Sequence, residues 1–221
     1  MNSNLADIVE LRRLPSPTIT PQALAWHEGT LWMSSRDAVR VYGVNAQTWA
    51  VVEENPAPGI PWAAVSSPGA LYFTTGEGAE DDRYLRRYFP GQGFDESYSV
   101  ALPELTGSYL SFDGQHFYLS QWYKHRVLRL GPDGSILRTI GIGAEICGHV
   151  FVGDWLYVLR GTEQDGERWK LARLDLREET PVVEDLARVP FACRSLTFDG
   201  QCFWTNHRAA NETVAFAMPN S

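Results

Sequence analysis

Cysteine is scarce in this sequence, and the few cysteines follow no disulfide or metal-binding pattern. They are Cys147, Cys193 and Cys202, an odd number with no CxxC spacing. This argues against a disulfide framework and favours reduced thiols in a cytoplasmic protein. The first residues, MNSNLADIVELRRLP, lack the basic and apolar segments of a secretory signal. No run of about 18 apolar residues occurs, so we expect no membrane-spanning helix.

Positive charge is also in short supply. Lysine and arginine together number 19 against 27 acidic residues, which leaves a net charge of -8 and a pI of about 5.1. This balance argues against a nucleic-acid partner, which requires a basic surface, and against binding to an anionic membrane. Hydrophobic residues, by contrast, make up 44% of the chain and include eight tryptophans, which is enough for a large buried core.

Helical periodicity is absent, and the chain instead repeats one short phrase, an apolar stretch followed by a tight turn and an aromatic-rich strand. The copies read QALAWHEGTLWMSS, WAAVSSPGALYFTT, SYLSFDGQHFYLSQ, CGHVFVGDWLYVLR and RSLTFDGQCFWTNH. The hydrophobic pair after each turn recurs every 39 to 47 residues, at Leu31-Trp32, Leu71-Tyr72, Phe117-Tyr118, Leu156-Tyr157 and Phe203-Trp204. A period of this length is typical of the four-stranded blades of a β-propeller.

The fifth copy ends after its third strand, and a candidate fourth strand lies at the other end of the chain. Residues 5–15, LADIVELRRLP, resemble residues 180–190, TPVVEDLARVP, and both lead into the next inner strand. We therefore predict an all-β, single-domain, five-bladed propeller of four-stranded antiparallel blades, closed by the N-terminal strand. The expected blades cover about residues 20–55, 59–103, 106–142, 145–189 and 191–218 with 5–15. An open β-sandwich is the alternative fold.

In a propeller, variable loops gather where the inner strands begin and the second strands end, a face that we call the mouth. Equivalent repeat positions place basic, amide, thiol and aromatic residues there. The candidates for ligand binding are Gln22, Arg36, Trp62, Tyr109, Gln121, Trp122, Cys147, Arg160 and Arg208. Arginines that are free of loop carboxylates such as Asp37 and Glu163 would suit a carboxylate or phosphate ligand. Arginines paired with those carboxylates would not.

Two histidines and a further arginine at the mouth are candidate catalytic groups. His149 stands where the other four copies carry an apolar residue, and His207 ends the second strand of the fifth copy. Either could act as a general base, with Arg194 stabilising developing negative charge. A buried histidine that only hydrogen-bonds a backbone carbonyl is the alternative for His149. Strict strand alternation would place Cys147 and His149 on one face.

A metal site is a weaker interpretation of the same region. Cys147, His149, Cys193 and His207 could meet across two inner strands, but C-x-H is not a zinc spacing, so a divalent metal is not favoured and the cofactor stays open. The cysteines are expected to be small buried hydrophobes. The acidic loop at 76–83, GEGAEDDR, lacks the EF-hand spacing and is expected to be solvated. The common hydrolase, nucleotide-binding and zincin motifs are missing.

The phrase QALAWHEGTLWMSSRDAVRVYGVN resembles the blade motif of the five-bladed bacterial and plant glutaminyl cyclases, and it is similar to blades of streptogramin lyase-like and gluconolactonase-like propellers. The resemblance spans nearly the whole chain but concerns the blade repeat. In the cyclases the first inner strand reads TQGL before an acidic residue. Here it reads TPQALAWHE, so Gln22 matches, whereas Arg194 and approximately His207 replace an Asn and a Lys. These departures argue against cyclisation of N-terminal glutamine.

Two hypotheses for function follow. The first is a lyase- or cyclase-type enzyme that acts on a small anionic substrate at the arginine- and histidine-lined mouth. The resemblance to the lyase-like propellers implies a histidine that removes a proton from that substrate. The second is a non-catalytic propeller that binds an anionic metabolite or an acidic peptide at the same face, and a protein-interaction scaffold is a further alternative.

Overall fold

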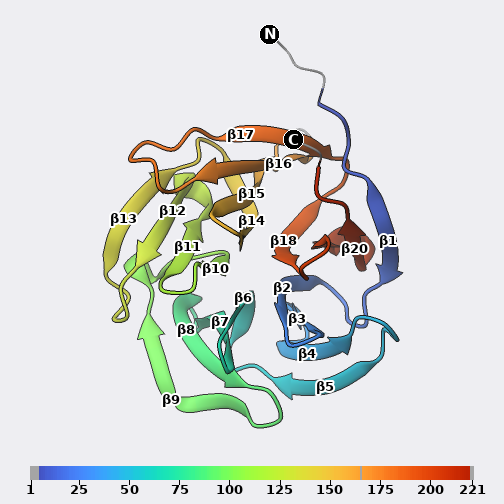
Figure 1. Ribbon diagram of the computed structural model, residues 1–221. Coiled ribbons are helices and arrows are strands. Elements are labelled where there is room, and N and C mark those ends of the chain that lie inside the picture. Colours follow the sequence, from blue (N-terminus) through green and yellow to red (C-terminus); the bar gives the residue numbers. More distant parts are fainter. Residues whose placement is uncertain (1–4, 165, 220–221) are drawn as a thin grey trace.

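Five antiparallel sheets stand around a central axis in the computed structural model, which describes residues 5–164 and 166–219 (Figure 1). The first blade contains β2 (Pro21–His27), β3 (Thr30–Ser35), β4 (Arg40–Asn45) and β5 (Val51–Pro56). The second contains β6 (Ile60–Ser67), β7 (Ala70–Glu77), β8 (Asp82–Phe89) and β9 (Gly93–Ala101). The third contains β10 (Leu110–Phe112), β11 (Phe117–Gln121), β12 (Arg126–Leu130) and β13 (Ile136–Gly141).

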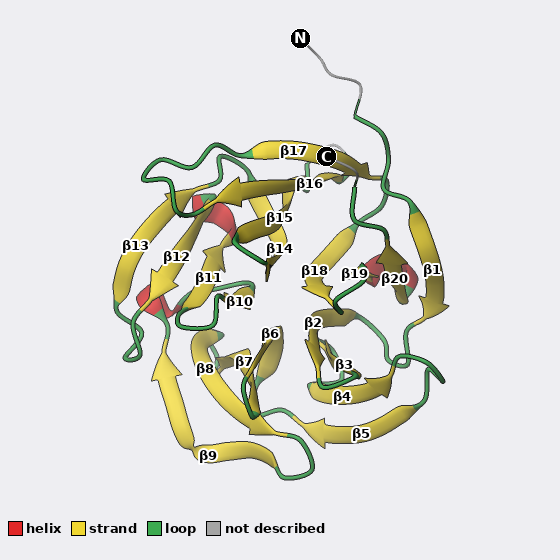
Figure 2. Ribbon diagram, in the orientation of Figure 1, coloured by secondary structure: helices red, strands yellow, loops and turns green. Residues whose placement is uncertain are grey.

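The last two blades complete the ring. The fourth contains β14 (Glu145–Val152), β15 (Trp155–Thr162), β16 (Arg168–Asp175) and β17 (Glu184–Val189). The fifth contains β18 (Cys193–Phe198), β19 (Phe203–His207), β20 (Glu212–Phe216) and β1 (Glu10–Pro15). The helical segments are the single turns η1 (Pro103–Leu105), η2 (Trp122–Lys124) and η3 (Arg208–Ala210), drawn red in Figure 2. No helix in the described part of the chain is long and apolar enough to cross a membrane.

One repeat position explains why the phrase is recognisable in the sequence. The turn from each inner strand to its second strand contains a glycine whose φ lies between 58° and 97°. Glycine enters this left-handed region without steric cost because it lacks a Cβ. These glycines are Gly29, Gly69, Gly114, Gly153 and Gly200. A tight turn of this kind keeps the inner and second strands of each blade adjacent and antiparallel.

The core consists of residues packed between neighbouring blades. Each hydrophobic pair predicted from the sequence contributes an aromatic ring that meets a ring of the next blade, with centroids 4.7 to 5.9 Å apart. Such edge and offset contacts add to the free energy of burial. The pairs are Trp32–Tyr88, Tyr72–Phe117, Tyr118–Phe151, Tyr157–Phe203 and Trp204–Trp49.

The N-terminal strand closes the ring. β1 pairs antiparallel with β20, so the fifth sheet has the strand order β1-β20-β19-β18. Just before β1, the backbone N–H of Ile8 donates to the carbonyl of Arg188 in β17 at 2.9 Å, which ties the same segment to the fourth blade. The guanidinium of Arg12 donates to the carbonyl of Ala46 in the first blade at 2.8 Å. The predicted five-bladed fold and its N-terminal closure are confirmed.

Candidate functional site

A pocket of about 220 Å³ opens at the mouth. Its walls come from the first residues of inner strands and from the residues that follow second strands, as expected for this face. Of the residues predicted from the sequence, those that line it are Gln22, Arg36, Trp62, Tyr109, Trp122, Arg194 and Arg208. The pocket is also lined by Arg83, Ser108, Tyr123 and Glu163, which were not predicted as binding residues.

β-Bulges explain how several inner strands turn side chains toward this pocket. The register with the second strand shifts around Gln22 in β2, at Trp62 in β6, at Cys147 in β14 and around Ser195 in β18. A bulge breaks strict alternation and re-aims the side chains next to it. Gln22 and Trp62 therefore reach the pocket, although they lie at the starts of inner strands whose side chains otherwise pack in the core.

Gln22 holds the guanidinium of Arg208 in place. The Oε1 atom of Gln22 accepts a hydrogen bond from Nη1 of Arg208 at 2.6 Å, while its Nε2 donates to the hydroxyl of Tyr109 at 3.0 Å and to the carbonyl of Trp62 at 3.2 Å. Because Gln22 is 1% exposed and both ends of its amide are engaged, its orientation is determined by its contacts. Arg208 is thereby directed to the pocket before any ligand arrives.

Arg208 carries a positive charge that no ion pair balances within the described residues. Its hydrogen-bond acceptor is the neutral amide of Gln22, and no carboxylate oxygen there lies close enough to pair with it. Burial, followed by repulsion from Arg194 and Arg36, lowers the pKa of Arg208 below its usual value, and attraction by the nearby carboxylate of Glu163 offsets only part of this. Arginine remains protonated despite this shift, so Arg208 is a half-buried cation that a bound anion would neutralise.

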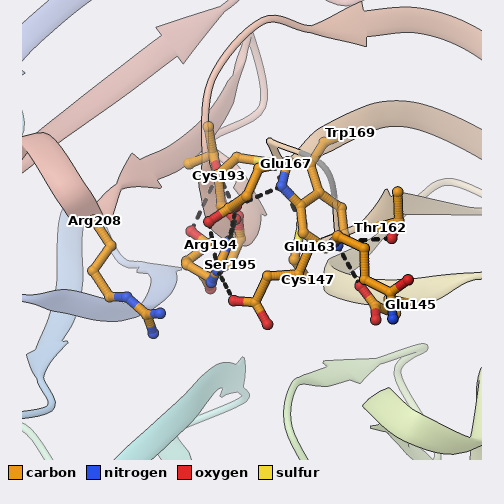
Figure 3. A network of polar contacts seen from close by, with 12 residues as sticks. Glu145, Cys147, Thr162, Glu163, Glu167, Trp169, Cys193, Arg194, Ser195 and Arg208 are labelled. Carbon is orange, nitrogen blue, oxygen red and sulfur yellow. Dashed lines mark hydrogen bonds and ion pairs between the residues drawn. The ribbon is translucent and has the colours of Figure 1, made fainter.

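Arg194 is a contrasting case, because it is saturated by carboxylates. Its Nη2 donates to Glu163 and its Nη1 to Glu167, both at 2.8 Å, and Nη1 also donates to the carbonyl of Cys193 at 2.7 Å. Figure 3 shows the two glutamates around Arg194, with Arg208 to one side of this network. Burial would raise the pKa of Glu167, but hydrogen bonds from Arg194 and Trp169 hold it below its usual value. Arg194 therefore acts as a buried structural charge.

Trp62 forms another part of the wall together with two arginines. Arg83 lies over its ring at 4.2 Å and Arg36 at 5.7 Å, distances at which the ring attracts a cation. The indole N–H donates to Asp81 at 3.1 Å, and Asp81 also pairs with Arg83. Arg36 pairs at 3.3 Å with the exposed Asp37. The pocket thus combines the unpaired Arg208, the weakly paired Arg36 and a solvent-facing carboxylate, Glu163.

The structure places both candidate catalytic histidines elsewhere. His149 is 1% exposed; its Nε2 faces the carbonyl of Tyr109 at 3.1 Å and its Nδ1 faces the hydroxyl of Ser111 at 2.7 Å. The carbonyl can only accept, so we assign the proton to Nε2. Burial lowers the pKa of His149 to about 4. This histidine ties the fourth blade to the third, and it does not line the pocket.

His207 and Arg160 also lie away from the mouth pocket, in ion-pair networks of their own blades. Nδ1 of His207 lies 3.3 Å from Arg13 and 3.5 Å from Glu212. Arg160 pairs with Asp185 at 2.7 Å and donates to the carbonyl of Ile142 at 3.1 Å. Repeat position alone placed them at the mouth, but side-chain direction takes both groups outward.

Gln121 and Cys147 complete the set of predicted residues. Gln121 is buried and donates to the hydroxyl of Thr106 at 2.8 Å, lining a neighbouring hollow and not the mouth pocket. Cys147 lies 3.4 Å from Cys193, sulfur to sulfur, on the side of the fifth blade. The bulge at Cys147 therefore separates it from His149, which faces the third blade, and the expectation that the two share a face is wrong.

The four residues considered as metal ligands do not converge. Cys147 and Cys193 meet each other, whereas His149 and His207 have the separate partners described above. Across residues 5–164 and 166–219 there is no group of three or more His, Cys, Asp or Glu side chains arranged to hold a metal ion.

Features of the sequence could have pointed to pocket residues that the sequence analysis missed. Arg83 is the second residue of β8, the third strand of its blade, at the same face of the ring, and it ends the acidic loop 76–83 that we expected to be solvated. That loop instead contributes Asp81 and Arg83 to the wall of the site. Ser108 and Tyr123 are chain neighbours of the predicted Tyr109 and Trp122. Their exposure at the mouth depends on loop conformation, which the repeat does not specify.

Comparison with known proteins gives matches in structure. No protein-family model and no curated protein matches the chain. Glutaminyl cyclase from Myxococcus xanthus superposes with a TM-score of 0.73 at 12% identity, covering 98% of this chain and 99% of that chain. Aldose sugar dehydrogenase from Streptomyces coelicolor gives a TM-score of 0.63 at 15% identity, covering 97% and 82% respectively.

A third solved structure is virginiamycin B lyase from Staphylococcus aureus, crystallised with quinupristin. It gives a TM-score of 0.53 at 12% identity, covering 94% of this chain and 98% of that chain. The resemblance to glutaminyl cyclases and streptogramin lyase-like propellers is thus confirmed for the fold. At these identities it carries the architecture alone, so function has to be argued from the site.

Proposed function

We propose that the mouth pocket binds a small molecule and recognises a carboxylate or phosphate group of that molecule. The observation that carries this proposal is Arg208, a half-buried guanidinium oriented by Gln22 and without an ion-pair partner among the described residues. A bound anion would accept hydrogen bonds from the remaining N–H groups of Arg208. Its negative charge would also offset the repulsion between Arg208 and the neighbouring Arg36 and Arg194. As a separate part of the proposal, we infer a cytoplasmic location, as expected from the sequence. The three free thiols support it.

The matching experiment compares two arginines that differ in their surroundings. Calorimetric titration with acetate and with inorganic phosphate measures affinity in the wild type, in Arg208→Gln and in Arg177→Gln. Arg177 is exposed, pairs with Asp154 and Asp175, and lies on the fourth blade, so it controls for net charge. We expect Arg208→Gln to weaken binding of the preferred anion at least about tenfold, because a charged hydrogen bond contributes about 1.5 kcal/mol or more.

Equal affinity in Arg208→Gln and the wild type contradicts the proposal, as does an equal loss in Arg177→Gln. Arg194 is unsuitable for this test because its removal leaves Glu167 and Glu163 without their partner. Loss of these pairs lowers the folding free energy, because the largely buried Glu167 is left without its partner. Lost binding in that variant would report on unfolding.

Catalysis by acid–base chemistry is a second candidate function, and Glu163 is the observation that favours it. Its carboxylate lines the same pocket as Arg208, and its side chain is 49% exposed, so it can reach a bound molecule. A carboxylate beside an anion site can remove a proton next to the bound carboxyl group while arginine stabilises the developing charge. The solved propellers named as a cyclase and a lyase show that this architecture hosts enzymes.

Proton removal is detectable without knowledge of the product. In D₂O, an acid that binds should exchange the hydrogen on the carbon beside its carboxylate, measured by NMR. Glu163→Gln should abolish the exchange and retain binding, whereas Glu179→Gln, an exposed acid of the fourth blade, should change neither. Exchange that survives in Glu163→Gln removes Glu163 from the mechanism.

A further inference from the structure

A second hollow adjoins the mouth pocket. Its volume is about 250 Å³, similar to the 220 Å³ of the mouth pocket. The two share the same wall, formed by Arg83, Ser108, Trp122 and Tyr123. A molecule longer than a single acid group that lies along this shared wall would therefore contact both spaces.

The second hollow differs from the mouth pocket in its chemistry. Leu105, Trp122 and Tyr123 supply apolar surface to it. Tyr123 is 89% exposed and Leu105 is 40% exposed, so both present hydrophobic surface that the fold itself leaves uncovered. Large apolar side chains gathered at the rim of a pocket are typical of a binding surface.

Charge in the second hollow is already neutralised. Arg83 pairs with Asp81 and donates to the carbonyl of Gly107 at 3.1 Å, and Lys124 pairs with Glu104. Neither of these cations resembles Arg208, which has no such partner in the part of the chain that is described. The remaining acid at the rim, Glu80, would repel an anion. The hollow thus favours an uncharged, apolar group.

The loop that forms this hollow is held in shape. Thr106 accepts from the buried amide of Gln121 at 2.8 Å, and the N–H of Leu105 donates to the carbonyl of Leu102 at 2.9 Å. Glu104 and Leu105 both have positive φ, at 58° and 52°. Non-glycine residues adopt this conformation at a cost and do so where the surroundings impose it. Leu105 is therefore presented to the hollow by a fixed turn.

We propose that the ligand of this protein is an acid with an attached aryl or alkyl group, whose anionic head contacts Arg208 and whose apolar part fills the second hollow. This rests on the anion site proposed above and specifies the class of molecule that it selects. The shared wall of Trp122 and Tyr123 lies between the two groups and would pack against the connecting chain. Burial of a phenyl or alkyl group there adds affinity in proportion to the apolar area removed from water.

The test is a titration series of acetate, phenylacetate, 3-phenylpropionate and 4-phenylbutyrate, with 3-phenylpropionamide as the uncharged control. We expect at least one phenyl acid to bind at least about tenfold more tightly than acetate, and the amide to bind at least about tenfold more weakly than its acid. Leu105→Asn should abolish the advantage of the phenyl acids and leave acetate unchanged. Asparagine tolerates the left-handed backbone, so this variant keeps the turn. Leu137→Asn, at an exposed leucine of β13, should behave as the wild type.

The outcomes separate this inference from the proposal on which it rests. Phenyl acids that bind no better than acetate, in a protein that does bind acetate through Arg208, overturn the second subsite alone. A phenyl preference that persists in both Leu105→Asn and Tyr123→Ala also overturns it, because the apolar group must then lie elsewhere. Failure of every acid in the series and of inorganic phosphate to bind overturns the anion site as well.

Discussion

At the scale of single residues, His149 illustrates how surroundings decide the role of an ionisable group. Its two ring nitrogens are occupied by Ser111 and by the carbonyl of Tyr109, inside the interface of two blades. Burial favours the neutral ring and lowers its pKa from 6.5 to about 4. A histidine in this state contributes to stability through its hydrogen bonds and is a poor proton acceptor at neutral pH.

This pKa predicts how stability depends on pH. The unfolded chain takes up a proton as the pH falls below 6.5, whereas folded His149 stays neutral until about pH 4. Stability present above pH 6.5 is therefore lost progressively toward pH 4, by about 2 kcal/mol between pH 7 and pH 5. Urea unfolding at the two pH values measures the loss, which should be much smaller in His149→Gln.

A direct readout accompanies this experiment in case the substitution prevents folding. The ring signals of His149 in the wild type, followed by NMR, should shift only slightly between pH 7 and pH 5. A titration midpoint near 6.5 would show that the ring is accessible to protons and would contradict the assignment of His149 as a buried, neutral link between two blades.

The mouth also shows which properties of single residues can be predicted from the sequence. Gln22, Trp62 and Arg208 could be found because equivalent repeat positions fix where their backbone lies. The direction of a long side chain is a different matter. Arg160 and Arg208 occupy similar repeat positions, yet Arg160 pairs with Asp185 on the outer part of its blade. This pairing depends on an acid of the outer strand of the blade, which the repeat phrase of the two inner strands does not contain.

At the scale of strands, the bulges near the mouth mark the limit of pattern analysis. The alternation of apolar and polar residues correctly predicts strands, but it assumes one residue opposite another. An extra residue at Cys147 changes which neighbour each following side chain meets. The repeat phrase cannot reveal this, because the inner strands are largely buried on both faces and their alternation is weak.

The bulge in β14 also brings two inner strands into close contact. A Cβ added to Gly148 would lie 2.5 Å from the carbonyl carbon of Ser195 and 2.7 Å from the backbone nitrogen of Leu196. Backbone atoms cannot move aside as a flexible side chain can. Ser195 is itself tied to the first blade, since its hydroxyl accepts from the N–H of Leu24 at 2.9 Å. The spacing of three inner strands therefore depends on the absence of a side chain at Gly148.

Replacement of this glycine should be costly. We expect Gly148→Ala to lower the free energy of unfolding by about 2 kcal/mol and the melting temperature by roughly 6 °C, because β14 and β18 must separate. Gly141→Ala is the matched control, since a Cβ there meets no atom within 4 Å. Circular dichroism melts of both variants measure the difference. Equal melting temperatures would mean that the inner ring adjusts without strain.

At the scale of the whole molecule, ring closure could be predicted from the sequence because the closing strand repeats a segment of another blade. Residues 5–15 resemble the outer strand of the fourth blade, and β1 occupies the equivalent place in the fifth. The sequence could not show that the same segment also hydrogen-bonds to β17 through Ile8 and to the first blade through Arg12. The N-terminal segment thus connects three blades and leaves β20 without a free edge.

If closure depends on these contacts and not on chain order, the closing strand can be moved. The backbone N–H of Ala217 donates to the carbonyl of Val9 at 2.9 Å, so the segment after β20 already lies beside the segment before β1. A circular permutant that starts at Ser16 and joins Met218 to Leu5 through about eight glycine and serine residues keeps every strand pair. It should melt within a few degrees of the wild type and bind the same acids.

A chain that starts at Ser16 and lacks residues 5–15 altogether should behave differently. It loses the burial of Ile8 and the pairing of β1 with β20, a loss of about 3 kcal/mol that corresponds to a melting temperature roughly 10 °C lower. The exposed edge of β20 should also promote self-association, visible by analytical ultracentrifugation. Addition of a synthetic peptide covering residues 5–15 should restore the melting temperature, because the strand can pair in trans. A truncated chain that melts like the wild type would show that the inner ring alone holds the five blades together.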